Sequence, residues 1–270
     1  MLVDSHDTDT DRNEPSDTEP GYVHSAAPDP RRLEPLDNPR IAEEEALGIS
    51  EQKKYYMFRN AKASVFIKRN LTPSEYGYNV VGRLLIPYMC FERMKNEAAA
   101  IRYIQSNTTI PTPNIRCAFE DHGRYYVITD IVPGVQLAHI PEDKKAVAIK
   151  EIEGYVAQMR ELKSKVIGGL LGDVLVPYRL QSAIPREQVL RLREAATPEF
   201  VFCHNDLSQH NVLVDETTFK VNAIIDWEFA GFFPPEFDGA FYHRPGPSVA
   251  LDGEEDDVPK LLELLEHWKE

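Results

Sequence analysis

The sequence has few cysteines and no long apolar run. Its three cysteines, Cys90, Cys117 and Cys203, are too few and too scattered for a disulfide framework, which excludes the class of small disulfide-stabilised secreted domains. No run of about 18 apolar residues occurs, and the first residues show neither a basic segment nor an apolar stretch. We therefore expect a cytoplasmic protein without a membrane span and without a standard secretion signal.

The chain also lacks an excess of positive charge. Its formal net charge is -14, and residues 1–46 contribute 13 acidic against 4 basic residues. The remaining residues are slightly acidic as well and contain no basic stripe. Because non-specific nucleic-acid binding depends on Lys and Arg that neutralise phosphates, we expect no nucleic-acid partner. One small anionic ligand stays compatible with this composition.

Residues 1–46 differ from the rest of the chain in composition. They carry six prolines, many Asp, Ser and Thr residues, and almost no periodic apolar pattern. Such a segment cannot bury enough apolar surface to offset the entropy of ordering it, so we predict a disordered acidic tail. The whole chain, with 270 residues and 42% hydrophobic residues, has the size of one bilobed or two small domains.

Apolar periodicity predicts strands first and helices afterwards. Order is expected to begin near Tyr55. The predicted strands of the first half are 55–58 and 63–68, joined as a hairpin, together with 83–86 and 124–131, and a helix is predicted over 93–105.

The second half is predicted to be more helical. A helix begins near Pro141 and extends to Leu162, a short hairpin joins 212–214 to 223–225, and an amphipathic helix containing Leu261 closes the chain. This order of elements indicates an α+β protein.

The most informative pattern gathers polar residues in one short stretch. His204, Asp206 and Asn211 form the pattern H-x-D-x-x-x-x-N, and Asp226 follows at the end of an apolar run. Phosphoryl transfer needs little covalent help from the protein but needs a nucleophile and a metal placed closely. Asp206 suits the acceptor of the substrate hydroxyl proton, Asn211 and Asp226 suit Mg²⁺ ligands, and His204 suits a structural group that holds the loop.

Other readings of these residues stay open. His204 and His210 suit metal ligands of a zinc or two-metal hydrolase, with Asp206 or Asp226 as a third ligand. Asp206, Asn211 and Asp226 also suit loop capping by their short polar side chains. Glu228 either assists a metal through water or anchors its loop to the C-terminal region.

The sequence segments around these residues resemble the aminoglycoside phosphotransferase and choline kinase-like family, in particular its small-molecule kinase branch common in fungi. Residues 201–211 are similar to the family's catalytic loop, residues 225–231 to its metal-binding Asp segment, and residues 129–134 to its hinge. The similarity extends from about Tyr55 to Arg244.

This resemblance implies an α+β, bilobal protein kinase-like fold. The strand-rich, nucleotide-binding N-lobe would comprise residues 47–132, and a mainly helical C-lobe with the catalytic loop and acceptor site would comprise residues 133–270. ATP or GTP with Mg²⁺ would lie in the cleft between them. The Asp130 carbonyl and the Val132 amide would then face the adenine.

A kinase-like N-lobe also needs a strand lysine that touches the phosphates and a helical glutamate that holds it. Glu97 shares the apolar face of its predicted helix, where an unpaired carboxylate is costly. Lys68 ends an apolar strand and is our candidate partner, with Lys62 and Arg83 as alternatives.

Two departures from the family pattern leave two functions open. No glycine occurs between Gly48 and Gly77, so Asn60–Ser64 would have to replace a glycine-rich phosphate cover, and only 44 residues follow Asp226. The first hypothesis is a Mg²⁺-dependent phosphotransferase that moves the γ-phosphate of ATP or GTP to a hydroxyl of a small molecule. The alternative is a kinase-shaped binding or scaffold protein with weak or no catalysis.

Overall fold

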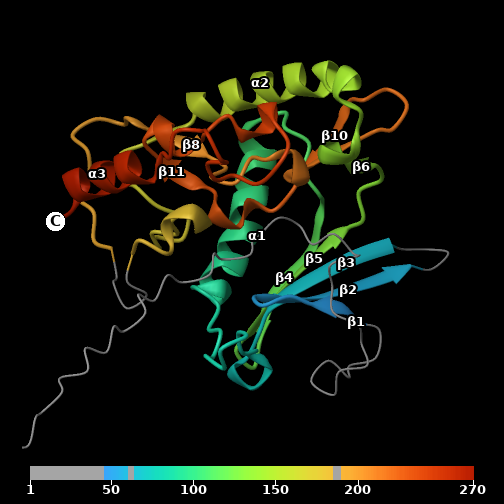
Figure 1. The fold of residues 1–270 in the computed structure, drawn as a ribbon, viewed down its shortest axis with the longest axis horizontal. Coiled ribbons are helices and arrows are strands. Elements are labelled where there is room, and N and C mark those ends of the chain that lie inside the picture. Colours follow the sequence, from blue (N-terminus) through green and yellow to red (C-terminus); the bar gives the residue numbers. More distant parts are fainter. Residues whose placement is uncertain (1–45, 60–63, 185–189) are drawn as a thin grey trace, which may run out of the picture.

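A five-stranded sheet lies on one side of a long helix, and the C-terminal region lies on the other side (Figure 1). The protein was examined as a computed structural model that describes residues 46–59, 64–184 and 190–270. The predicted disordered tail therefore lies, apart from Ala46, outside the described residues. Among the described helices, none combines the length and the apolar character that crossing a membrane requires.

The N-terminal sheet is antiparallel throughout and has the order β1-β2-β3-β5-β4. Its strands are β1 (Ala46–Ile49), β2 (Lys53–Arg59), β3 (Ser64–Asn70), β4 (Ile115–Asp121) and β5 (Arg124–Asp130). Aromatic and β-branched residues fill β2, β3 and β5, as expected of strands that pack on a pleated surface. The register sets Lys68 opposite Tyr55 on one neighbour and Val127 on the other, so Lys68 lies in the middle of the sheet.

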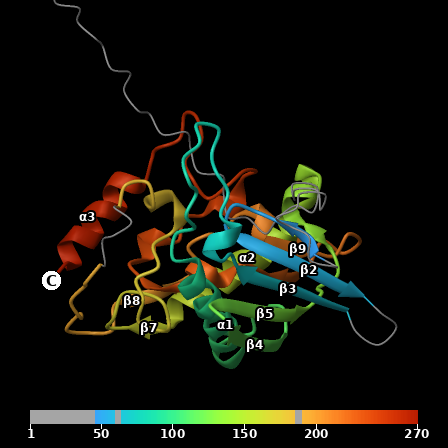
Figure 2. The same ribbon diagram turned by 90° about the horizontal axis from the view of Figure 1, so that it is seen from below.

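Helix α1 (Cys90–Asn107) joins the sheet to the C-terminal region (Figures 1 and 2). Its first half buries Met94 and Ala98 against Val127 of the sheet. Its second half buries Ile104 in the large core of the C-terminal region. The helix therefore carries one apolar face that is shared by both parts of the molecule.

The C-terminal region combines two helices with two small antiparallel sheets. The helices are α2 (Ala146–Glu161) and α3 (Val258–Trp268). One sheet has the order β10-β9-β6, with β10 (Val221–Ile224), β9 (Val212–Val214) and β6 (Val135–Gln136). The other has the order β11-β8-β7, with β11 (Gly231–Phe233), β8 (Phe200–Cys203) and β7 (Lys163–Ser164). The predicted lobe boundary falls between β5 and β6.

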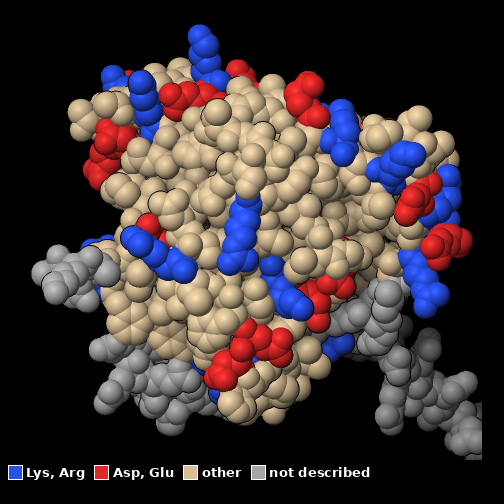
Figure 3. Space-filling model, turned by 180° about the vertical axis from the view of Figure 1, so that it is seen from behind, with Lys and Arg blue, Asp and Glu red and all other residues tan. Residues whose placement is uncertain are grey.

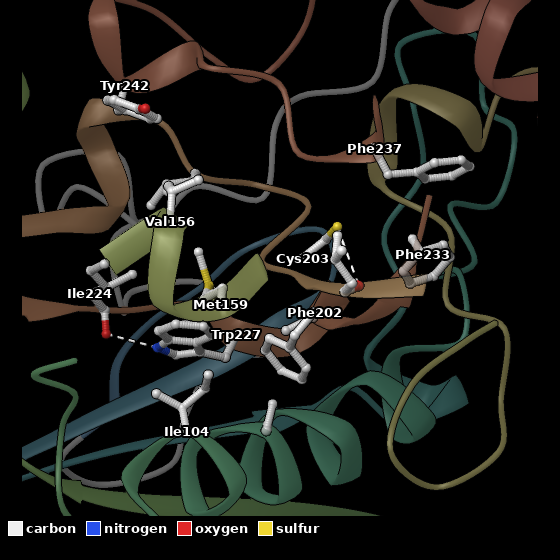
Figure 4. Packing of buried hydrophobic residues seen from close by; sticks show 14 of the residues in the cluster. Ile104, Val156, Met159, Phe202, Cys203, Ile224, Trp227, Phe233, Phe237 and Tyr242 are labelled. Carbon is white, nitrogen blue, oxygen red and sulfur yellow. Dashed lines mark hydrogen bonds between the residues drawn. The ribbon is translucent and has the colours of Figure 1, made fainter. Parts of the chain in front are cut away.

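The core of this region surrounds Trp227 (Figure 4). Its indole nitrogen donates a hydrogen bond of 2.8 Å to the Ile224 carbonyl, so the ring is both buried and satisfied. Phe202 packs beside Trp227, and Met159 of α2 belongs to the same cluster. This packing holds the segment that follows β10 in one position.

Two glycines allow the chain to pass close to other backbone segments. Gly134, at φ +117°, lies where a Cβ would approach the Val214 carbonyl oxygen to 2.4 Å. At Gly231 a Cβ would approach the Gly168 carbonyl oxygen to 2.3 Å. Larger residues at either position would push β6 or β11 away from its neighbour.

The sequence-based strand predictions hold for the hairpin of β2 and β3 and for β5, but not everywhere. The predicted strand 83–86 is wrong: Leu84 forms only an isolated bridge with Tyr78, in an exposed loop that buries too little surface to build a sheet. Strands β1 and β4 were not predicted, and β1 and the start of β2 show that ordered strands are present before Tyr55, where order was expected to begin.

Of the later elements, the predicted ones are present, but strands β6, β7, β8 and β11 were not predicted. The terminal helix and the hairpin of β9 and β10 are present. Helix α2, however, begins at Ala146 and not at Pro141, because a short 3-10 turn over Glu142–Lys144 comes first. On the face shown in Figure 3, basic and acidic side chains are interspersed.

Candidate active site

A cavity of about 170 Å³ lies between the N-terminal sheet and the hairpin of β9 and β10. Tyr55, Met57 and Phe66 form its apolar wall on the sheet side, and Leu213 and Ile225 form the wall on the other side. Small-molecule pockets typically measure roughly 300–1,000 Å³, so the volume of this cavity is small. Its apolar walls suit a flat ring, and its two ends are polar.

One end of the cavity is formed by the predicted hinge. Asp130, Ile131 and Val132 line it, directly after β5. The Asp130 carboxylate is held from outside the cavity by Arg116 at 2.5 Å and by Asn114 at 3.3 Å. The main chain of residues 130–132 therefore lies at the cavity edge, as the sequence analysis predicted. Its contact with the adenine of a nucleotide stays a prediction.

The other end is charged, and the loop after β8 supplies its first groups. Asn211 donates its side-chain amide to the Asp206 main-chain oxygen at 2.8 Å and to the Asp206 carboxylate at 3.1 Å. The Ile225 amide in turn donates to the Asn211 carbonyl at 2.9 Å, one step beyond the paired residues Val212 and Ile224. The short hairpin thus brings Asn211 next to Asp226, although 15 positions separate them in the sequence.

His204 holds this loop through both ring nitrogens. Nδ1 lies 3.2 Å from the Asp206 amide, which donates to it, and Nε2 lies 3.0 Å from the Ile225 carbonyl. Burial lowers the pKa of His204 to about 4, so the ring is neutral near neutral pH and donates through Nε2. These two contacts match the structural role predicted for His204. They occupy both ring nitrogens, so neither nitrogen is left to bind the metal of a hydrolase.

Asp226 adopts a left-handed conformation at φ +65°, which is uncommon for a residue with a side chain. Its Oδ1 atom lies 3.1 Å from Lys68 Nζ and 3.4 Å from Lys53 Nζ. Burial alone would raise the pKa of this carboxyl, but the two ammonium groups outweigh burial and lower it to about 2. Asp226 is therefore ionised in the cleft.

Lys68 and Glu97 form the ion pair that the sequence predicted. Glu97 is fully enclosed on α1, and burial raises its pKa to about 7 although Lys68 opposes this change. Of the alternative partners, Lys62 lies outside the described residues, and Arg83 is exposed. Asp226 and Glu97 thus share one lysine at the end of the cavity opposite the hinge.

Glu228 anchors this end of the cleft. Its carboxylate lies 2.6 Å from Lys53 Nζ and 3.3 Å from Arg93 of α1, and all three side chains are buried. Asn96 of α1 donates to the Glu228 carbonyl at 3.1 Å. These contacts anchor the Glu228 loop to β2 and α1 and not, as predicted, to the C-terminal region, and the predicted role of Glu228 at a metal stays a prediction.

Asp206 lies within the reach of this charge cluster. Burial, followed by the negative charge of Asp226, raises its pKa to about 8. A cation held at Asp226 would weaken the second of these causes and favour the ionised carboxyl that a proton acceptor needs.

The residues present fit a hard divalent cation better than zinc. Asp226 Oδ2 is buried and has no hydrogen-bond partner among the described residues, and carboxylate and amide oxygens are the ligands that Mg²⁺ prefers. Mg²⁺ usually takes only one or two carboxylates from a protein, with substrate phosphates completing its shell. Within the same described ranges, no cluster of three His, Cys, Asp or Glu side chains is arranged around a metal position, as the zinc alternative would require.

The predicted phosphate cover, Asn60–Ser64, lies outside the described residues apart from Ser64. The Ser64 carbonyl accepts a hydrogen bond from the Ile131 amide, so Ser64 adjoins the hinge. The turn near Asp226 is Ser50–Gln52, between β1 and β2, because adjacent turns of an antiparallel sheet lie at opposite ends of the strands.

Lys53 is the site residue that the sequence analysis missed. It alternates with Tyr55 and Met57, which line the same cavity, so the period of a strand was the available signal. Without knowledge of β1, the position of Lys53 at the charged end could not be inferred.

Part of the chain is similar to known proteins. Residues 153–267 match the phosphotransferase enzyme family. Probable choline kinase 1 from Arabidopsis thaliana is 36% identical over 83 residues, which cover 27% of this chain and 23% of that protein. Probable choline kinase 3 from the same plant is 27% identical over 119 residues, which cover 41% of this chain and 32% of that protein. The match thus spans about a quarter to a third of these relatives.

Solved structures with a similar backbone include a thermostable mutant of aminoglycoside phosphotransferase APH(4)-Ia in ternary complex with AMP-PNP and hygromycin B. It is 15% identical, with a TM-score of 0.47 over 72% of this chain and 68% of that chain. Aminoglycoside phosphotransferase APH(3'')-Id from Streptomyces rimosus is 16% identical, with a TM-score of 0.43 over 67% of this chain and 73% of that chain. The family match includes residues 204–211 and Asp226, and together with the matches to the choline kinases it confirms the resemblance of this chain to the aminoglycoside phosphotransferase and choline kinase-like family.

Proposed function

We propose that the protein transfers the γ-phosphoryl group of ATP to a hydroxyl group of a small molecule. One observation carries the proposal: the Lys68–Glu97 ion pair meets Asp226 at the end of a cavity whose other end is the hinge main chain. This is the arrangement that phosphoryl transfer requires of a kinase-like cleft. GTP in place of ATP is compatible with the same geometry.

Each residue has a task in this proposal. The apolar walls and the main chain of Asp130 and Val132 hold the base, and Lys68 binds the phosphates while Glu97 keeps it in place. Asp206 orients the acceptor hydroxyl and takes its proton. Asp226 and the side-chain oxygen of Asn211 hold Mg²⁺, which supplies charge neutralisation for the phosphates.

The decisive experiment is a screen for ADP formation over hydroxylated small molecules, with Asp206→Ala as the test variant. Loss of the general base should lower turnover by about 10²- to 10⁴-fold while nucleotide affinity stays within about twofold. Asp215→Ala is the matched control, because Asp215 lies in the turn of the adjacent hairpin and its carboxylate accepts hydrogen bonds from the neighbouring Thr217 and Thr218. Equal turnover of Asp206→Ala and wild type would reject the proposal.

One observation favours the alternative of a kinase-shaped binding protein. Two lysines already pair with Asp226, and the volume of the cavity is small, so a nucleotide must displace existing contacts to enter. Thermal shift separates the two functions. A ligand at 100 times its Kd adds about 2.7 kcal/mol to the free energy of unfolding. A protein that binds the nucleotide should therefore unfold at a clearly higher temperature in millimolar MgATP. No shift with MgATP or MgGTP would favour the binding protein.

A further inference from the structure

Lys53 points its ammonium group into the charged end of the cleft. Its Nζ atom lies 2.6 Å from Glu228 Oε2 and 3.4 Å from Asp226 Oδ1, and the residue is 2% exposed. It lines the same cavity as Lys68, from the neighbouring strand. Two lysines therefore converge on one carboxylate oxygen of Asp226.

The turn that delivers Lys53 contains no glycine and is firmly held. The Lys53 amide donates to Ser50 Oγ at 3.0 Å, and the Ser50 amide donates to the Lys53 carbonyl at 2.8 Å. The side chain of Gln52 contacts Arg93, and its carbonyl accepts from Cys90 Sγ at 3.1 Å. Glycine-rich covers bind phosphates through closely approaching main-chain amides. This turn instead offers a side-chain ammonium at its end.

The charges of the cluster explain how Lys53 is able to change partners. Glu97 pairs with Lys68, and Glu228 pairs with Arg93 as well as with Lys53, so each of these carboxylates keeps a cation if Lys53 moves away. A divalent cation at Asp226 would bring a third positive centre to a carboxylate that already faces two, and like charges repel at these distances. The phosphates of a nucleotide are the anions that would then attract the displaced ammonium group.

We propose that Lys53 is a second phosphate-binding lysine, which pairs with Asp226 before a nucleotide enters and moves to the terminal phosphates of a bound nucleoside triphosphate. In this role it replaces the glycine-rich cover. The inference rests on the proposed function, because it concerns the same nucleotide.

The test compares Lys53→Met with Lys54→Met. Lys54 is the next residue of β2 and equally buried, but it extends toward Glu75 at 3.8 Å and does not line the cavity. Calorimetry measures the binding of ATP, of AMP, which lacks the terminal phosphates, and of Mn²⁺ without nucleotide. Lys53→Met should weaken ATP binding about tenfold or more and leave AMP binding unchanged. It should tighten Mn²⁺ binding severalfold, because one competing cation is gone from Asp226.

These opposite signs distinguish phosphate binding from a structural role. Unchanged ATP affinity in Lys53→Met, or ATP, AMP and Mn²⁺ binding all weakened together, would overturn the inference. Lys54→Met should change none of the three affinities by more than about twofold. Lys53→Gln provides a second variant of similar length if Lys53→Met does not give a cooperative thermal transition. A wild-type protein that binds no ATP would refute the proposed function itself, whereas wild-type ATP binding with no effect of Lys53→Met or Lys53→Gln refutes only this inference.

Discussion

The two sides of the cleft are stabilised in different ways. In the described chain, the large apolar cluster contains 33 buried residues and belongs mainly to the C-terminal region. The clusters at the N-terminal sheet contain four and two buried residues. Where the sheet faces the cleft, it buries Lys53 and Lys68, which pair with carboxylates of α1 and of the C-terminal region.

This difference indicates that the two sides of the cleft have different roles. A close-packed apolar core permits one arrangement, so Asp206, Asn211 and His204 are held in fixed positions on the C-terminal side. A buried charge requires a partner of opposite charge, and an incoming ligand group of the same sign as the present partner meets that requirement. The charged side chains of the sheet therefore suit contacts that form and break as a ligand enters and leaves.

The largest expected effect tests the difference in packing. Met159 of α2 and Met94 of α1 are both 0% exposed, but Met159 lies in the large cluster and Met94 in the cluster of four. Truncation of a buried methionine to alanine costs about 2–5 kcal/mol, depending on how far the site collapses. We expect Met159→Ala near the upper end and Met94→Ala near the lower end, measured by urea unfolding. Equal losses would contradict the comparison.

The second prediction tests the ion pair of the sheet side. Lys68→Met should weaken ATP binding by about tenfold or more, and Glu97→Gln by a smaller factor, because Glu97 acts only through Lys68. The double variant should bind ATP no more weakly than Lys68→Met alone. Calorimetry with ATP measures all three affinities. Additive losses would show that the two residues act separately.

The smallest expected effect concerns an ion pair of the sheet side that lies away from the cleft. Arg69 of β3 pairs with Glu75 at 2.7 Å. Burial raises the pKa of Glu75, but the hydrogen bonds from Arg69 and Thr72 outweigh burial and lower this pKa to about 2. A carboxyl group whose pKa is lowered on folding stabilises the folded protein at pH values above its ordinary pKa of 4.5. This contribution is lost as the pH falls from 4.5 toward 2.

Wild type should therefore exceed Glu75→Gln in stability by about 1 kcal/mol near neutral pH, with solvent screening of this half-buried group taken into account. The gap should close as the pH falls below about 4.5. Unfolding midpoints over this range measure it, with Glu120→Gln at an exposed position of β4 as the control. A gap that does not change with pH would show that Glu75 stabilises the sheet by packing and not by charge.

The C-terminal side of the cleft was the easier half to predict. His204, Asp206 and Asn211 lie within eight positions, and a short hairpin brings Asp226 back to them, so local chain geometry suffices to bring them together. Their roles in catalysis stay predictions until the variants are measured. Strong apolar periodicity likewise predicted α1, α2 and α3, since helices with one buried face carry that pattern in the chain itself.

The sheet side was harder to predict. Strand β1 has four residues and no alternating pattern, so the sequence analysis recognised neither β1 nor the turn Ser50–Gln52 that follows it. The strand predicted over 83–86 has apolar residues, but nothing in the described chain pairs with it beyond one bridge. Short strands depend on partners that local sequence does not specify.

What the sequence by itself determined was the grouping of polar residues in the loop 204–211 and the need of Glu97 for a cation, because Glu97 is a carboxylate on an apolar helix face. What only the tertiary structure decided was which cations meet at Asp226. Strand pairing sets the positions of Lys53 and Lys68 across the sheet, and a pairing register depends on contacts between segments far apart in the chain. Such contacts are a property of the folded whole, and no local pattern of residues specifies them.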